Sequence, residues 1–393
     1  PRFAYVKGVN GRSSGSVSWG GLYSFVTGLI EQGGSRRGAL MLILNVWHPD
    51  TMEFINSKRE MGKITNANIS VGITDDFMEA VEKNADWDLI FPDTSDERYA
   101  DQWTGNINRW KEMGGKVIVH KTVKAREVWD QLTASAWASA EPGMWFIDRT
   151  NKMSNSYYYE QGDLVCTNPC GEQPLPPWSV CNLGHVNLSR FVTNGEVAWK
   201  DLGRSVRASV RFLDNVIDAT PYFFAENEKQ QKEERRVGLG TVGMAEMLIR
   251  LKLRYGSPES VEFLDKLYQF IAREAYMASA EFAEEKGSFA RFDAAKLLES
   301  GFMLGMPEDV REAVAQKGLR NVTLLTQAPT GTVGTMIGTS TGIEPFFYWS
   351  YFRKGRLGVH EEKVKIVEEF NAAHPGEALP DYFVNAMELT PDE

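Results

Sequence analysis

The sequence predicts an α/β protein, because short apolar stretches of strand length alternate with longer stretches of helical spacing. Ala39 to Val46 is a continuous apolar run, as in a parallel strand buried on both faces, and Asn68 to Ile73 and Met144 to Ile147 are also predicted as strands. Helical spacing marks residues 122–140 and 206–217. This alternation is typical of βα units around a mostly parallel sheet or barrel.

Size and charge limit the classes of function that the chain can have. Its 393 residues are 42% hydrophobic and 24% charged, ordinary proportions for a globular protein with a sizeable core. The net charge of −10 argues against nonspecific binding to nucleic acid or a membrane surface, although local basic pockets remain possible. No apolar run reaches the roughly 18 residues of a membrane span, so no membrane partner is expected.

A helix with an apolar face is predicted before the first strand. Apolar residues over 22–30 fall at helical spacing, and the glycines at 33–34 are a normal C-terminal signal. A tight basic loop over residues 35–38 follows. Its residues Arg36 and Arg37 could bind phosphate, or the loop could be a solvated turn.

Capping signals place the next elements. A short helix is predicted over Asp50 to Lys58, with a polar connection over residues 59–66. Thr74 is suited to cap the helix after the second strand, and two aspartates follow in the first turn of that helix, at its positive end. Residues 87–91 are predicted as a further strand.

Two glycine and proline signals organise the second half of the chain. Ser257 and Pro258 predict the start of a long helix that ends at Gly287. Residues 238–243 match the GxGxxG pattern of a nicotinamide-dependent dehydrogenase, which should follow a strand. A charged run precedes it instead, so close packing of helices is the favoured interpretation.

A strand is predicted over Val322 to Gln327, running into the Thr- and Gly-rich loop 328–335. Hydroxyls and backbone N–H groups at one spot suit an anion such as phosphate, and a plain turn is the alternative. The loop lacks the lysine of an ATPase phosphate loop. From His360 onward the charge pattern is helical, followed by Pro-rich connections.

The most reactive group of residues lies in the middle of the chain. Asn168, Cys170 and Glu172 occupy alternate positions, and side chains at alternate positions of an extended segment point the same way. The carboxamide could hold a ligand, the thiol could react and the carboxylate could take a proton. The alternative is a turn, since Asn-Pro and Cys-Gly are common loop dipeptides.

The three cysteines, Cys166, Cys170 and Cys181, fall within sixteen residues. A sparse, odd and clustered set does not fit a secreted disulfide framework. We therefore expect reactive thiols in a reducing compartment, the cytoplasm. A zinc site is weakly indicated because no CxxC pair exists, and no metal site is predicted.

Four ordered blocks resemble the catalytic subunit of ribonucleotide reductase. They are Gln32 to Ala39, Asn168 to Gly184, Arg236 to Gly243 and Ala328 to Pro345. The resemblance implies a ten-stranded α/β barrel with a central finger loop at about 163–182. Residues 1–393 would then be a single catalytic domain that lacks the first and last parts of the barrel.

The resemblance also assigns chemistry to the central residues. Cys170 would become a thiyl radical that takes the 3′ hydrogen of a ribonucleotide, shielded inside the barrel. Glu172 would accept the proton of the 3′-hydroxyl, and Asn168 would hydrogen-bond the substrate. Cys181 would be one of the two thiols that supply the reducing electrons. The product would be a 2′-deoxyribonucleotide for DNA synthesis.

Two further sets of residues are implied as binding sites. Those implied to bind the substrate, a ribonucleoside di- or triphosphate, are Ser14, Gly15, Pro329, Thr330, Gly331, Thr332 and Val333. Those implied to bind a dNTP or ATP effector, which controls the choice of substrate, are Arg36, Arg37 and Lys63.

The short spacing from Cys170 to Cys181 looks most like the adenosylcobalamin-dependent class II. The alternative is a class I alpha chain that takes its radical from a metal-containing subunit. A thioredoxin-like external dithiol would serve as reductant, and a homodimer is possible.

Two departures from the family pattern bear on the complete cycle. No cysteine precedes Cys166, although the family has a redox cysteine on an earlier strand, and Cys166 is a weak substitute because it shares a segment with Cys170. The chain also lacks an initiating Met and stops before the family's last strands. We expect it to begin inside a longer product. The alternative is a nucleotide-binding fragment that needs a companion chain for activity.

Overall fold

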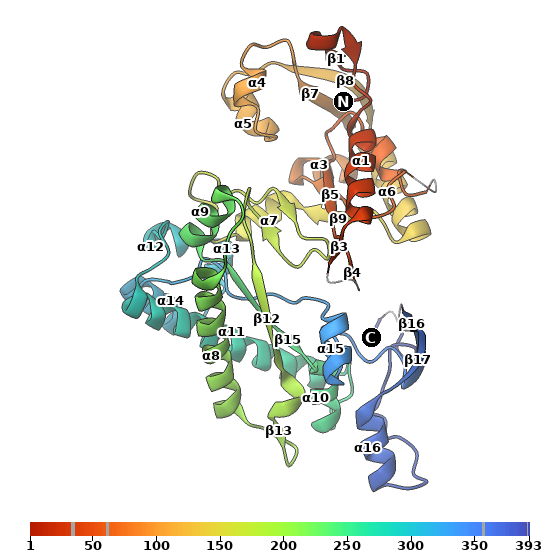
Figure 1. Ribbon diagram of the computed structural model, residues 1–393, viewed down its shortest axis with the longest axis vertical. Helices are drawn as coiled ribbons and strands as arrows, with labels where there is room; N and C mark the ends of the chain where they lie inside the picture. The colour runs from red at the N-terminus through yellow and green to blue at the C-terminus, as the bar shows by residue number, and fades with distance from the viewer. Residues whose placement is uncertain (33–35, 60–62, 356–357, 391) are drawn as a thin grey trace. The chain divides into compact units, whose positions relative to one another are not determined.

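The computed structural model describes residues 1–32, 36–59, 63–355, 358–390 and 392–393. This part of the chain forms two compact units, each with its own core (Figure 1). The first unit comprises Pro1–Lys152 and Leu164–Pro174, and the second comprises Met153–Asp163 and Leu175–Glu393. Each is described by itself, and the single domain over 1–393 stays a prediction.

The first unit is built on a parallel sheet, as the sequence predicted. Its strands are β5 (Met41–Asn45), β6 (Asn68–Ile73) and β9 (Gly143–Phe146), in the order β5-β6-β9. Central strand β6 is buried in five of its six residues. Strand β5 is only half-buried throughout, because it lies at the edge of the sheet, so the predicted burial on both faces is wrong for this strand.

Local signals set the helices of this unit. Among them are α2 (Thr51–Ile55), α3 (Asp75–Glu82) and α6 (Ala125–Ser139), and α7 (Ile147–Met153) follows β9. The predicted cap is confirmed, since the Thr74 Oγ1 accepts a hydrogen bond from the backbone N–H of Phe77 at 3.3 Å. Phe54, Ile69 and Phe77 belong to the core between helices and sheet.

An antiparallel pair of strands was not predicted. Strand β7 (Asp86–Pro92) pairs with β8 (Val117–Lys124), and α4 (Tyr99–Gln102) and α5 (Ile107–Glu112) lie between them in the chain. Residues 122–124 therefore belong to a strand and not to the predicted helix, which begins at Ala125. Five of the eight residues of β8 are β-branched, which favours the extended pairing.

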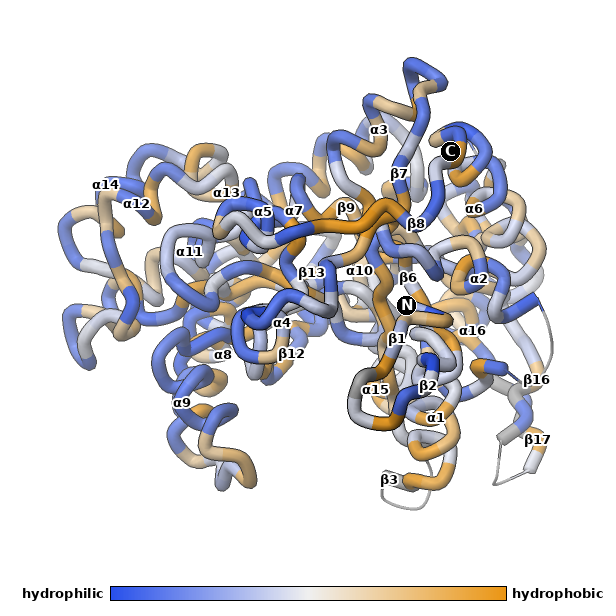
Figure 2. Tube along the Cα trace, turned by 90° about the horizontal axis from the view of Figure 1, so that it is seen from above, coloured by the Kyte–Doolittle hydropathy of each residue, from blue (hydrophilic) through white to orange (hydrophobic). Residues whose placement is uncertain are grey.

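Helix α1 (Ser16–Leu29) forms where a helix was predicted, but it ends at Leu29, before the predicted stop at residues 33–34, which lie outside the described residues. The apolar side over residues 22–30, which marked the helix in the sequence, is exposed. Phe25 is 64% and Leu29 is 67% exposed, and Figure 2 shows much of this helix in hydrophobic colours. The helix packs instead through its small residues: a Cβ on Gly20 would lie 3.1 Å from the Leu42 side chain. The short neighbouring elements are β1 (Tyr5–Val6), η1 (Lys7–Val9), β2 (Gly11–Arg12), β3 (Glu31–Gln32) and β4 (Arg36–Arg37).

The second unit places two parallel strands against long helices. Strand β12 (Asn182–Asn187) pairs with β15 (Val237–Val242), and α8 (Trp199–Ala219) and α11 (Pro258–Lys286) pack against one another (Figure 1). Helix α11 confirms the predicted start and end: the Ser257 hydroxyl caps it and Gly287 ends it. Val210, Leu239 and Ile271 are among the buried core residues of the second unit.

The remaining elements of the second unit are short. They are η2 (Leu188–Phe191), β13 (Val192–Thr193), β14 (Glu196–Val197), α9 (Ala225–Glu234), α10 (Met244–Arg250), α12 (Ala294–Leu297), α13 (Gly301–Leu304), α14 (Glu308–Lys317), α15 (Gly331–Ile337), β16 (Ser350–Gly355), β17 (Gly358–Lys363) and α16 (Lys365–Ala373). The tail is thus partly extended, because β17 continues to Lys363 before the predicted helix begins. Among the described residues, no helix combines the length and apolar character that a membrane crossing requires.

The GxGxxG segment is a buried strand and not a helix contact, which corrects the packing predicted for it. Residues 237–242 form β15, and every one of them is buried. A Cβ on Gly240 would lie 2.7 Å from the backbone oxygen of Thr326, so glycine allows a neighbouring segment to approach. That segment is the predicted strand 322–327, which runs beside β15 but forms only a single bridge, at Leu325.

Candidate functional site

The central motif forms a closed turn. Short strands β10 (Cys166–Thr167) and β11 (Pro174–Leu175) pair on either side of it. The Asn168 backbone N–H donates to the Gln173 oxygen at 3.1 Å, and the Gln173 N–H donates to the Asn168 Oδ1 at 2.9 Å. Gly171 takes a φ of +86°, which favours glycine. The predicted extended segment is wrong, and the alternative of a turn is confirmed.

The turn still gathers the three predicted groups on one short loop. Cys170 is exposed at its tip, and Asn168 and Glu172 are half-buried. The Asn168 carbonyl is used to close the turn, so the chemistry left to this side chain is that of its amide donors. The shielding expected for Cys170 is not provided by the described residues: the thiol is exposed, and a Cβ on Gly171 beside it would meet nothing within 4 Å.

A cavity of about 300 Å³ in the first unit lies against the turn. Its wall contains Cys170 together with the first residues of all three parallel strands, Met41, Asn68 and Gly143. Ser70 and Glu141 also line it. No sequence signal pointed to these two residues, because a serine within an apolar strand and a glutamate before a proline are ordinary in any protein.

Cys181 lies in the second unit, directly before β12, and is half-buried. Its thiol donates to the oxygen of Asn182 at a sulfur distance of 3.8 Å. Cys166, on β10 in the first unit, is half-buried, and burial raises the pKa of its thiol. Cooperation of Cys181 with Cys170 stays a prediction.

The Thr- and Gly-rich segment begins a helix rather than an open loop. Thr330 has a φ of +50°, and its hydroxyl accepts a hydrogen bond from the backbone N–H of Gly342 at 2.8 Å. Helix α15 starts at the next residue. Pro329 and Gly331 line a cavity of about 460 Å³, whose described wall does not include Thr332 or Val333. These two residues are exposed.

Two lysines missed by the sequence analysis also line this cavity. Lys363 and Lys365 lie at the end of β17 and the start of α16, and Glu344 lies in the same wall. Exposed ammonium groups beside backbone N–H groups are suited to bind phosphate oxygens. The charge pattern after His360 was the available signal, but only the fold brings it to residues 329–331.

Ser14 and Gly15 lie in the first unit, just before α1. Ser14 is exposed, and Gly15 is buried with a φ of +92°. The Asp50 carboxylate accepts hydrogen bonds from the backbone N–H groups of Ser16 and Arg2. Burial raises the pKa of Asp50, but these hydrogen bonds outweigh it and hold the pKa below its usual value. Substrate binding here stays a prediction.

The predicted effector residues are only partly within the described residues. Arg36 and Arg37 form β4, which pairs with β3, and their side chains lie outside the description. Lys63 is exposed. Residues 33–35 and 60–62 of the two predicted loops lie outside the described residues. Within the described chain, no group of three or more His, Cys, Asp or Glu is arranged to hold a metal ion.

The fold and the turn together define an α/β protein with a thiol, a carboxylate and a carboxamide on one loop, as in enzymes that act through sulfur. A family profile described as "Ribonucleotide reductase, barrel domain" matches residues 1–373. The chain belongs to this family, which confirms the predicted resemblance and fold class.

Curated relatives agree with this assignment. The chain is 38% identical over 355 residues to a "Vitamin B12-dependent ribonucleoside-diphosphate reductase" of Thermoplasma acidophilum, covering 90% of this chain and 41% of the relative. It is 36% identical over 349 residues to a protein of the same name from Mycobacterium tuberculosis, covering 88% of this chain and 45% of the relative.

A more distant match is the "Ribonucleoside-diphosphate reductase subunit alpha" of Chlamydia pneumoniae. It is 28% identical over 390 residues, covering 90% of this chain and 37% of the relative. The chain thus spans less than half the length of these curated relatives. All three are named as reductases, so the chain is homologous to oxidoreductases.

Proposed function

We propose that the chain carries the active-site part of a ribonucleotide reductase and converts ribonucleotides to 2′-deoxyribonucleotides for DNA synthesis. The observation that carries the proposal is the hydrogen-bonded turn that holds Asn168, Cys170 and Glu172 within five residues, in a chain of this family. In this proposal the chain acts in the cytoplasm, where thiols stay reduced.

Each group on the turn has a defined role in the proposed reaction. Cys170, as a thiyl radical, takes the 3′ hydrogen of the ribose and later returns it. Glu172 accepts the 3′-hydroxyl proton, and the amide of Asn168 donates a hydrogen bond to the substrate. The 2′-hydroxyl leaves as water, and two thiols give the two electrons and become a disulfide.

Cys181 is proposed as one of these two thiols, and a thioredoxin-like dithiol would reduce the disulfide afterwards. The other thiol is not assigned. Cys166 is the remaining cysteine of this chain, and a companion chain is the alternative source. The chain covers less than half of its relatives, so the source of the second thiol is the part of the proposed cycle that turnover of the isolated chain has to decide.

The residues present fit a cobalamin-dependent start of the reaction. Cys170 is exposed at a turn tip with open space at Gly171, so a bulky cofactor could approach the sulfur directly. Adenosylcobalamin, when bound, supplies the one-electron chemistry that removes a hydrogen atom from a thiol. Two relatives are named vitamin B12-dependent. The class I alternative rests on the relative named "subunit alpha".

The substrate phosphates are proposed to bind at the 329–331 segment. Backbone N–H groups at the start of α15 and the ammonium groups of Lys363 and Lys365 supply the positive potential. Thr330, Thr332 and Val333 would shape the same segment. Ser14 and Gly15 are also proposed as substrate-binding residues, on the family resemblance. A diphosphate substrate is consistent with the names of the relatives.

The proposed effector loops carry a separate prediction. Replacing Lys63 or Arg36 with alanine is expected to change, by several-fold, which ribonucleotide is reduced in the presence of a given dNTP, because both loops would link effector to substrate base. The ratio of products from four competing nucleotides measures this. Lys83→Ala, an exposed lysine on the C-terminal side of α3, is the control and should leave the ratio unchanged. An unchanged ratio in both loop variants would refute the effector assignment.

Turnover of the isolated chain is the direct test of the proposed function. The chain is incubated with adenosylcobalamin, a ribonucleoside diphosphate or triphosphate and a dithiol, and deoxynucleotide is measured by chromatography. We expect product with adenosylcobalamin and none with a cobalamin that lacks the adenosyl group. Product that appears only after a second chain is added would favour the companion-chain alternative. Product that instead requires a metal-containing radical subunit would favour class I.

A further inference from the structure

Strand register gives Cys181 and Arg236 matching positions on two neighbouring segments. Strands β12 and β15 are parallel, with Asn182 opposite Val237. The residues directly before this pair are Cys181 and Arg236, so they occupy matching positions at the start of the two strands. Side chains at matching positions of parallel neighbours lie on the same face of a sheet.

A glutamine fixes this register. The Gln231 amide nitrogen donates to the Arg236 oxygen at 2.8 Å and to the Asn182 Oδ1 at 3.4 Å. Gln231 therefore links Asn182, the residue after Cys181, to Arg236. Gln231 is 1% exposed, so this bridge is buried.

Arg236 is buried with only part of its guanidinium used. Its side chain is 3% exposed, and its Nε donates to the Glu234 Oε2 at 3.3 Å. Its Nη1 reaches the Thr323 hydroxyl at 3.5 Å. Within the described chain, the buried Nη2 has no hydrogen-bond partner. An uncommitted donor of this kind is costly unless a further group satisfies it.

The neighbouring acid is already satisfied by other groups. The Tyr159 hydroxyl donates to the Glu234 Oε1 at 2.6 Å, and the Ser179 hydroxyl donates to its Oε2 at 3.2 Å. Burial and the Glu234 charge raise the pKa of Tyr159, so this donor keeps its proton. The Glu234 carboxylate thus accepts hydrogen bonds from Tyr159, Ser179 and Arg236. It uses only the Nε of the Arg236 guanidinium.

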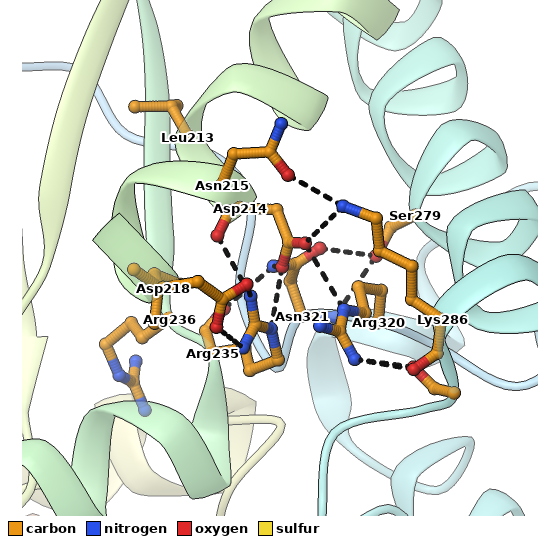
Figure 3. Close-up of polar contacts among 12 residues, drawn as sticks. Leu213, Asp214, Asn215, Asp218, Arg235, Arg236, Ser279, Lys286, Arg320 and Asn321 are labelled. Atoms are coloured by element: carbon orange, nitrogen blue, oxygen red, sulfur yellow. Dashed lines mark hydrogen bonds and ion pairs between the residues drawn. The ribbon is translucent and has the colours of Figure 1, made fainter. Parts of the chain in front are cut away.

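The two arginines of the pair 235–236 have different tasks. Arg235 points into an ion network with Asp214 and Asp218, whereas Arg236 is turned away from that network, with no contact drawn to it (Figure 3). The ion pairs of Arg235 with Asp214 and Asp218 hold the end of α9 against α8. Arg236 is paired instead with the buried Glu234, and its Nη2 edge is not used by that ion pair.

We propose that Arg236 is a positioning residue that stabilises the thiolate form of Cys181 with its uncommitted guanidinium edge. This inference rests on the proposed function, because it concerns the thiol that would supply electrons there. When the thiol gives its proton to solvent, the resulting anion gains a charged donor at the neighbouring strand position. Its hydrogen bond to the Asn182 oxygen is lost in the same step.

The charged and titratable groups around Arg236 and Cys181 are consistent with a guanidinium that favours the thiolate. Among the groups that act on Arg236, burial lowers the pKa of the guanidinium, while Glu234, Tyr159 and Cys181 raise it, and the balance leaves it raised. Arg236 therefore stays protonated at all relevant pH values. Glu234 opposes a thiolate, and its three donors reduce that opposition.

The test measures alkylation of Cys181 in the full chain with Cys166→Ser and Cys170→Ser. In this background we expect the pH midpoint of iodoacetamide alkylation to lie below that of an ordinary thiol, which is about 8.5. Adding Arg236→Met should raise the midpoint by about one pH unit and slow alkylation near neutral pH by roughly tenfold. Arg236→Lys, which keeps the charge, should restore most of the rate.

Several outcomes would overturn the inference. A midpoint at or above the ordinary thiol value with Arg236 in place refutes it, even if Arg236→Met fails to fold. Equal rates in Arg236→Met and its parent also refute it when both melt cooperatively. Alkylation does not depend on nucleotide reduction, so the proposed function can fail while this result stands, and the reverse holds as well.

Discussion

Replacing Cys170 with serine is expected to abolish deoxynucleotide formation, a loss on the order of 10⁴-fold or more, as for other groups that carry out the bond chemistry. A hydroxyl forms an oxygen radical far less readily than a thiol forms a sulfur radical, so the hydrogen transfer would stop. The turn should survive, because its closing hydrogen bonds run between Asn168 and Gln173 and do not use the thiol. Turnover and equilibrium nucleotide binding are both measured.

The matched control is Cys166→Ser. Cys166 lies four residues earlier on β10 and is half-buried, so the same change of atom is made on the same segment. We expect this variant to keep turnover. Loss of activity there would instead make Cys166 the second reducing thiol. Turnover that persists in Cys170→Ser with unchanged nucleotide binding would show that the radical is carried by another residue.

Local signals predicted much of the fold. The bounds of β6, the Thr74 cap of α3 and both ends of α11 followed from apolar runs, capping hydroxyls and glycines, all of which act over a few residues. The pairing of β7 with β8 was missed, because it joins segments separated by two short helices. The exposed side of α1 was missed because periodicity identifies an apolar face without identifying what covers it.

The site was predicted in its residue types and less well in its geometry. The hydrogen bond from the Gln173 backbone N–H to the Asn168 side chain and the positive φ of Gly171 fold the motif into a turn, so alternation along a strand does not describe it. Burial of Cys170 depends on what covers the turn, which no short pattern encodes. Arg236 was missed as a separate residue, because a run of charges usually indicates a solvated helix, and Figure 2 shows α9 itself as mostly hydrophilic.

The buried network beside that run leads to the second large effect. Asp214, on α8, has a side chain that is 1% exposed. Its carboxylate accepts hydrogen bonds from Arg235 Nε at 2.7 Å and from Asn321 Nδ2 at 3.0 Å (Figure 3). Arg320 and Lys286 lie within 3.6 Å of the same carboxylate. Several cations therefore depend on one buried anion for their neutralisation.

Asp214→Asn should lower the free energy of unfolding of the second unit by about 3–5 kcal/mol, the cost of leaving a buried ion without its partner. The new side chain has nearly the same shape, so the loss reflects charge and not packing. Urea titration followed by circular dichroism measures it. Glu285→Gln is the matched control, because it removes an exposed partner of Arg211 between α11 and α8 and should leave the free energy of unfolding nearly unchanged.

The difference in free energy of unfolding between the native chain and Asp214→Asn should depend on pH, and this dependence shows whether the Asp214 charge causes it. Burial raises the pKa of Asp214, but the hydrogen bonds and charges of Arg235 and Arg320 outweigh it and hold the pKa below its usual 3.8. A carboxyl whose folded pKa is depressed stabilises the fold fully above its unfolded pKa and loses this contribution as pH falls through the folded pKa. The gap between the native chain and Asp214→Asn should therefore stay constant above pH 5 or so and shrink below 3.8. A gap that does not narrow on acidification would mean that shape, and not the carboxylate charge, holds α8 to α9.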